Sequence, residues 1–140
     1  MPYCTQSDLL EQISETELIG LSDDAGAGAI DATVIARSIA DADAEIDTYC
    51  ASRYTVPFAT VPAMIRKVSV DVAIYNLFAR RRGAPDDRKE RYKNALRFLE
   101  AVAKGDVTLG ADDPEAASQN HAPQMSSGTR IFTRDKMSGF

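Results

Sequence analysis

The sequence predicts an all-α protein, a small bundle of about four helices followed by an extended C-terminal arm. Within residues 1–110, apolar residues recur three and four positions apart, which is typical of helices with one buried face. Capping residues, prolines and glycines separate these segments. After Gly110 the composition changes to Asp, Pro, Ser, Gln and Gly without a periodic apolar pattern. A segment of that kind cannot fold alone, so we expect a helical domain at residues 1–110 and an arm at residues 111–140.

The first helix is expected over residues 5–15, because capping residues from Thr5 onward precede the first apolar positions. Residues 17–21 are expected to add a further turn. The segment 22–29 is rich in Asp and Gly and therefore predicts a loop. The apolar residues of the first helix are Leu9, Leu10 and Ile13.

A long amphipathic helix is expected over residues 33–53, with Asp31 as its N-cap. Its acidic residues, described below as a candidate interface, project mainly away from the apolar stripe. The residues of that stripe are Val34, Ile35, Ile39, Ala42, Ile46, Tyr49 and Cys50.

The next helix begins at Pro62 and ends at the basic run 80–82 and Gly83, which suit a helix C-terminus. Apolar residues cover more than one of its faces, which predicts a central helix or an oligomer contact. Asp71 interrupts this run and is either buried with a basic partner or exposed. The apolar residues are Met64, Ile65, Val68, Val70, Val72, Ile74, Tyr75, Leu77 and Phe78.

The last helix is expected from Pro85 to about Lys104, and Gly105 stops it. Its apolar side contains Tyr92, Leu96, Leu99, Val102 and Ala103, and its other sides contain Arg88, Lys89, Lys93 and Arg97.

The composition excludes several classes of protein. A chain of 140 residues with 44% hydrophobic residues can bury one core, and no run of 18 apolar residues indicates a membrane span. The first residues do not form a secretory signal, so we expect a cytoplasmic start. Cys4 and Cys50 are far apart and lack metal-ligand spacing, which favours reduced thiols.

The net charge of −5 is unevenly distributed along the chain. Residues 1–60 contain 11 acidic and 2 basic residues, whereas residues 61–110 contain 6 acidic and 11 basic residues. An acidic surface and a basic surface on one subunit fit a head-to-tail contact between copies, which forms a ring if it closes.

Candidate catalytic and metal sites are few. The single histidine, His121, lies in the polar arm, where no rigid shell could hold it as a general base. The segment from Asp23 to Asp31 contains carboxylates but lacks the ligand order and the final glutamate of a calcium loop, which favours a loop with a helix cap. No catalytic sequence motif is present, so we expect neither an enzyme nor a cofactor.

Several short segments along nearly the whole chain carry a resemblance to a known family, and the most specific part runs from Ile39 to Tyr54. These segments are Ser7–Leu10, Glu17–Asp23, Gly26–Asp31, Ala40–Asp47, Ser52–Tyr54, Pro57, Val61–Pro62, Arg91–Tyr92, Ala95–Leu99 and Arg130–Phe140. In these segments the sequence resembles the head-tail adaptor (connector or neck) proteins of Mu-like tailed phages and prophages, which are small helical proteins.

The resemblance implies a virion structural protein at the neck, assembled in the host bacterial cytoplasm. Related connectors form rings, dodecameric in several cases, beneath the portal of a DNA-filled head. Such a ring would extend the DNA channel, let genomic DNA pass without specific binding, and dock a stopper or tail-completion protein. No catalytic residues are implied, and no membrane is involved.

Two sets of residues are candidates for these contacts. The C-terminal arm would dock on a neighbouring subunit or on the portal, with Phe132 and Phe140 as apolar anchors. The full set of arm residues is Arg130, Ile131, Phe132, Arg134 and Phe140. The charge-complementary subunit interface would join Asp41, Asp43, Glu45 and Asp47 to Arg88, Lys89 and Lys93.

A small helical DNA-binding protein is the alternative interpretation, because basic residues are dense between Arg80 and Arg97. The sequence pI of about 4.8 argues against free nucleic-acid binding. Steeply salt-dependent DNA affinity would favour this alternative.

Overall fold

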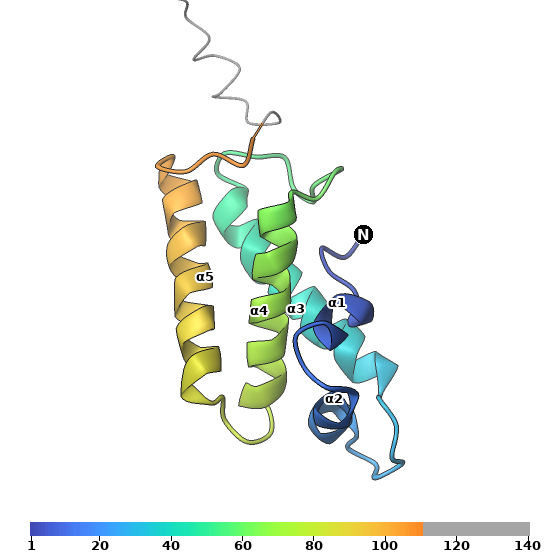
Figure 1. Cartoon of the computed structure of the whole chain (residues 1–140). Coiled ribbons are helices and arrows are strands. Elements are labelled where there is room, and N and C mark those ends of the chain that lie inside the picture. The colour runs from blue at the N-terminus through green and yellow to red at the C-terminus, as the bar shows by residue number, and fades with distance from the viewer. Residues whose placement is uncertain (111–140) are drawn as a thin grey trace, which may run out of the picture.

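The computed structural model describes residues 1–110, which form a helical bundle (Figure 1). This confirms the predicted all-α class, although the described part contains five helices. Their bounds are α1 Gln6–Leu10, α2 Glu15–Ser22, α3 Ala32–Cys50, α4 Ala63–Ala79 and α5 Asp86–Lys104.

The helix predicted over residues 5–15 is interrupted after Leu10. Thr5 and Asp8 form the expected reciprocal capping box of α1. Ser14 then caps a new helix, α2, because its side chain accepts a hydrogen bond from the Glu17 amide at 3.2 Å. The sequence predicted one continuous helix because Ile13, which lies between α1 and α2, continues the apolar spacing and is buried in the same core.

Helix α4 lies between its neighbours in Figure 1 and is the central element of the bundle. Helix α3 and helix α5 both pack against it, and α1 and α2 also contact it. Apolar residues on several faces of α4 are accordingly buried, as predicted. They are Ile65, Val68, Val70, Val72, Ala73, Ile74, Leu77 and Phe78.

Asp71 is buried among these apolar residues and has basic partners, which decides between the two interpretations left open by the sequence. Its carboxylate lies 3.0 Å from the Lys67 ammonium and 3.8 Å from a guanidinium nitrogen of Arg91. A buried carboxylate without a partner would be strongly destabilising, so these cations account for an acid in this helix.

The N-terminal segment is held against α3 and against the loop between α3 and α4 by Tyr3, whose side chain is almost fully buried. The Tyr3 hydroxyl donates to Asp47 and accepts a hydrogen bond from the Phe58 amide at 3.2 Å. Its ring packs against Phe58, with 5.5 Å between ring centroids. Burial and the bond to Asp47 raise the pKa of Tyr3, so the hydroxyl keeps its proton.

Arg53 joins the end of α3 to the end of α5. Its guanidinium donates to the Val102 carbonyl at 3.0 Å, where a cation is favoured by the helix dipole. It also covers Gly105, whose φ of +88° ends α5 in the left-handed conformation as predicted. The adjacent Tyr54 hydroxyl accepts a hydrogen bond from the Leu109 amide at 3.0 Å.

We predict that Tyr3→Phe lowers the free energy of unfolding by about 1–3 kcal/mol, because the buried Phe58 amide would lose its acceptor. Urea denaturation followed by circular dichroism measures this change. Tyr75→Phe removes a hydroxyl outside this cluster and serves as the matched control. Equal stability of the two variants would show that the Tyr3 hydroxyl does not hold the N-terminal segment.

Candidate interaction surfaces

The acidic residues predicted at a subunit interface all lie on α3, but they differ in their surroundings. Asp41 is exposed, whereas Asp43 and Asp47 are half-buried beneath the N-terminal segment. Asp43 accepts hydrogen bonds from the Tyr3 amide at 3.0 Å and from the Ser69 hydroxyl at 2.9 Å. Burial raises the pKa of Asp43 despite these bonds. Two of the four predicted interface acids therefore have a structural role within the subunit.

Glu45, the fourth of these acids, faces α5. It accepts a hydrogen bond from the Tyr92 hydroxyl at 2.8 Å. The Tyr92 ring is stacked on Tyr75, with 4.0 Å between centroids. Burial, followed by the bond to Glu45, raises the pKa of Tyr92 to about 12. Tyr75, Tyr92 and Glu45 thereby join α4, α5 and α3, with each ring near the core and the Tyr92 hydroxyl bonded to a carboxylate.

The sequence predicted Arg88 on an outer side of α5, but the structure places it elsewhere. Its side chain is only 13% exposed and donates to the Gln12 carbonyl at 3.2 Å. Arg88 lies one turn from Tyr92, on the face that packs against the bundle, so its stem is buried. Lys89 and Lys93 are exposed, as predicted.

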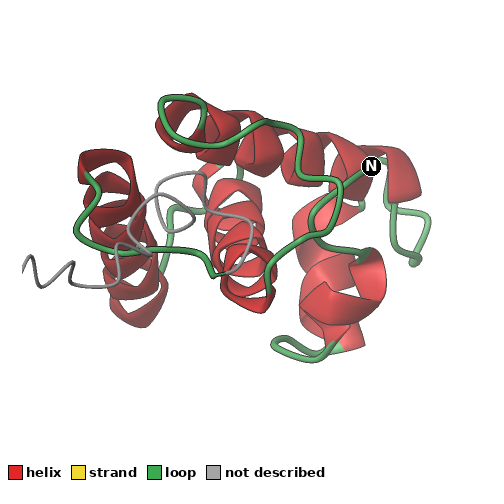
Figure 2. Ribbon diagram, turned by 90° about the horizontal axis from the view of Figure 1, so that it is seen from above, coloured by secondary structure: helices red, strands yellow, loops and turns green. Residues whose placement is uncertain are grey.

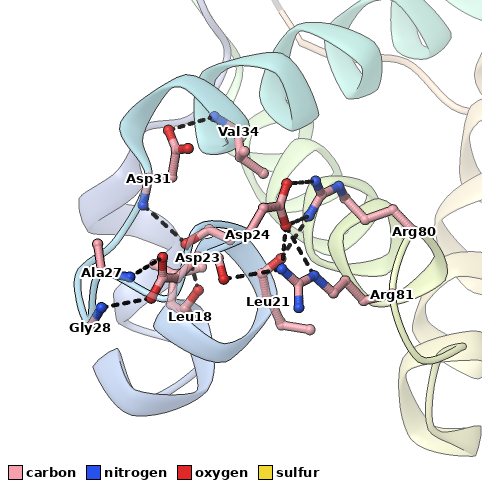
Figure 3. Close-up of polar contacts among 11 residues, drawn as sticks. Leu18, Leu21, Asp23, Asp24, Ala27, Gly28, Asp31, Val34, Arg80 and Arg81 are labelled. Carbon is pink, nitrogen blue, oxygen red and sulfur yellow. Dashed lines mark hydrogen bonds and ion pairs between the residues drawn. The ribbon is translucent and has the colours of Figure 1, made fainter.

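Part of the basic run at the end of α4 is paired within the subunit (Figure 3). Arg80 and Arg81 both donate to the carboxylate of Asp24, and Arg80 also donates to the Leu21 carbonyl at 3.0 Å. The bonds from Arg80 and Arg81 lower the pKa of Asp24 to about 2. The DNA-binding alternative therefore depends chiefly on Arg82, Lys89, Lys93 and Arg97, which are exposed.

The loop between α2 and α3 uses its carboxylates for its own geometry (Figure 3). Asp23 accepts hydrogen bonds from the amides of Ala27, at 2.9 Å, and Gly28, at 2.7 Å. Asp31 caps α3 by accepting from the amides of Thr33 and Val34, as predicted for a cap. Within residues 1–110, no cluster of three acidic, His or Cys residues could hold a metal ion.

The edge of the bundle formed by α1 and α2 presents exposed acids, whereas the α5 edge presents exposed bases together with the exposed acids Asp86, Asp87, Glu90 and Glu100. Helix α5 lies at one edge and α1 and α2 lie at the other, as both views show (Figures 1 and 2). Exposed acids on or beside α1 and α2 are Glu11, Glu15 and Glu17. These three glutamates were not included in the predicted interface. They are nevertheless part of the excess of acidic residues in residues 1–60 from which the interface was predicted.

Burial raises the pKa of Cys4 and Cys50 to about 11, and both thiols are free. A thiol that keeps its proton at neutral pH is a poor nucleophile. No helix within residues 1–110 is long and apolar enough to cross a membrane.

Comparison with known proteins identifies the family. The family described as "Bacteriophage Mu, Gp36" matches residues 3–127. This chain belongs to the phage Mu Gp36 family. It is 32% identical over 115 residues to the Mu-like prophage FluMu protein gp36 of Haemophilus influenzae, covering 81% of this chain and 80% of that protein. It is 31% identical over 144 residues to Gene product J of Escherichia phage Mu, covering 100% of this chain and 99% of the relative.

These findings confirm the predicted connection to Mu-type phages. The predicted arm contacts lie outside the described residues, so they stay predictions. Those residues are Arg130, Ile131, Phe132, Arg134 and Phe140.

We predict that Asp24→Asn lowers the melting temperature at neutral pH, because Arg80 and Arg81 lose a carboxylate partner. The folded-state pKa of Asp24 is about 2, below its ordinary value of 3.8, so its contribution is present above that value and is lost as the pH falls toward 2. The difference between wild type and variant should therefore disappear between pH 4 and pH 2.

Calorimetric scans of both proteins across this pH range measure the effect. Asp106→Asn changes another exposed carboxylate and serves as the control. A difference in melting temperature that persists unchanged at pH 2 would contradict the assignment to the carboxylate of Asp24.

Proposed function

We propose that this protein is a virion structural protein, a head-tail adaptor that assembles as a ring beneath the portal. The ring, dodecameric as in related connectors, extends the DNA channel and docks a stopper or tail-completion protein. Genomic DNA passes through the lumen without specific binding. The protein acts at the virion neck after assembly in the host bacterial cytoplasm, and it is not an enzyme.

The distribution of charge on the bundle is the observation that carries this proposal. Exposed acids lie on the α1 and α2 edge, and Asp41 adds an exposed acid on α3. The exposed bases Lys89 and Lys93 lie on α5 at the opposite edge. A head-to-tail contact needs two different, complementary surfaces on each subunit, and repeating this contact generates a ring when the rotation closes.

Family membership supports the same proposal, because the family is described by a bacteriophage Mu protein and the match spans residues 3–127. Arg80 and Arg81 are paired with Asp24, which lowers the number of basic residues that could bind DNA. We propose that the remaining exposed bases of α5 contact the acidic edge of the next subunit.

The first test is the mass of the full chain in solution, measured by light scattering alone and after mixing with the portal protein of the same phage. A ring, or a complex that forms only with the portal, supports the adaptor. DNA affinity is measured in the same buffer. A small species that ignores the portal and binds DNA with a steep salt dependence would establish the DNA-binding alternative instead.

We predict that Lys89→Glu combined with Lys93→Glu weakens subunit association at least about tenfold, because like charges would then oppose each other across the contact. Both lysines are exposed, so helical content should not change. Arg37→Glu combined with Arg66→Glu makes the same charge change at exposed positions on α3 and α4 and is the matched control. Association that both double variants affect equally would show that the α5 edge is not the contact.

The role of the arm is tested separately. We predict that deleting residues 129–140 leaves the helical content intact and abolishes incorporation into heads, because the anchors Phe132 and Phe140 are lost. Phe132→Ala with Phe140→Ala should reproduce the defect, and Met125→Ala with Met137→Ala is the control. Immunodetection in purified heads measures incorporation. Normal incorporation of the deleted protein would refute the docking role.

A further inference from the structure

An open apolar groove of about 610 Å³ lies between the N-terminal segment and one face of α3. Four alanines spaced one helical turn apart form its α3 side, and Ile35 and Ile39 lie beside them. Met1 and Pro2 line the opposite side. The four alanines are exposed, so the groove has room for side chains larger than those that line it. They are Ala32, Ala36, Ala40 and Ala44.

Two carboxylates, Asp43 and Asp47, also line this groove. Both are held in place by Tyr3, through its amide to Asp43 and its hydroxyl to Asp47. Ser69 holds Asp43 from the α4 side at 2.9 Å. An occupant of this groove therefore needs large apolar side chains next to positive charges, because fixed acceptors favour cationic donors.

One segment of this chain has that composition. Ile131 and Phe132 are adjacent large apolar residues, with Arg130 directly before them and Arg134 and Lys136 shortly after. The 19 residues between Gly110 and Arg130 can span at most about 70 Å when extended. That length is more than twice the roughly 28 Å of a 19-residue helix such as α3, so the segment can reach the groove of its own subunit or of an adjacent copy.

We propose that the groove between the N-terminal segment and α3 is the docking site of residues 130–136 of this chain. Ile131 and Phe132 enter the apolar part over the alanines, and the arginines face Asp43 and Asp47. The inference concerns the free protein as well as any assembly, so it does not require the proposed ring.

The test uses the full-length chain with p-benzoylphenylalanine, a photo-cross-linking residue, in place of Phe132. After irradiation, mass spectrometry locates the cross-linked peptides. We expect them in residues 1–6 and 32–47. Products of monomer mass and of dimer mass both support the proposal, since they report the same groove on the same or on an adjacent copy. Cross-links confined to other parts of the chain would overturn it.

Substitutions in the groove add a second readout. Ala40→Lys fills the groove and repels the arginines, so the cross-link yield should fall at least about tenfold, the loss expected when an aromatic anchor is displaced. Ala79→Lys makes the same change at an exposed position of α4 that does not line the groove, and it should leave the yield unchanged. Equal yields in these two variants would overturn the proposal.

A third test changes residues that lie outside the described bundle of residues 1–110. Arg130→Glu with Arg134→Glu, in the chain that carries the cross-linker, should also lower the yield and remove its dependence on salt, because the attraction to Asp43 and Asp47 is lost. An unchanged yield would show that charge does not direct the segment to this groove. Failure of ring formation in light scattering, with the cross-link intact, would contradict the proposed function and leave this inference standing.

Discussion

The burial of α4 on most of its surface is the constraint on which the rest of the structure depends. Ten of its 17 residues are buried, and Ile65, Val72, Ala73, Ile74 and Leu77 have no exposed surface. Each large apolar side chain contributes about 1.5–3 kcal/mol when it leaves water, so this helix must be surrounded. Helices α3 and α5 cover it, and the segment containing α1 and α2 covers another part. The edge formed by α1 and α2 and the edge formed by α5 are thereby held on opposite sides of one helix (Figure 1).

Polar groups within and beside α4 select one arrangement of these neighbours. The Ser38 hydroxyl of α3 donates to the Ala73 carbonyl of α4 at 2.7 Å. Ser69 donates to Asp43, and Asp71 is paired with Lys67 and lies near Arg91. Buried polar groups are costly when they lack partners, so a shifted packing of α3 or α5 on α4 would lose these bonds. Apolar burial makes the bundle compact, and these bonds determine how its helices are placed.

The same pairing determines which charges remain for partners. Asp24, Glu45, Arg80 and Arg81 have partners within the subunit. The exposed charges that remain include Glu15 and Glu17 at one edge and Lys89 and Lys93 at the other. Charges outside the core of an interface mainly influence association rate, orientation and specificity. In the proposed ring, the edges would therefore orient adjacent subunits, while apolar contacts such as the groove beside α3 would supply affinity.

The sequence by itself determined the helical class, the caps at Thr5 and Asp31, the stop at Gly105 and the apolar character of several faces of α4. These features depend on residues close together in the chain, where helical period and capping chemistry act locally. The break at Ser14 is also local, but the apolar spacing continues across it and conceals it. The connection to Mu-type phages could likewise be inferred from short segments of the sequence, and the family match over residues 3–127 confirms it.

Only the tertiary structure decided which charged residues are available to partners. Tyr3 contacts Asp43 and Asp47 across 40 and 44 positions of the chain, and Asp24 contacts Arg80 across 56. The spacing of apolar residues predicts which face of a helix is buried, but it does not predict which distant residue lies next to that helix. Arg88 illustrates the limit, since a charged head group favours solvent while its long apolar stem can be buried against the bundle. Those contacts arise from the packing of α1, α3 and α5 around α4, which depends on all the helices together.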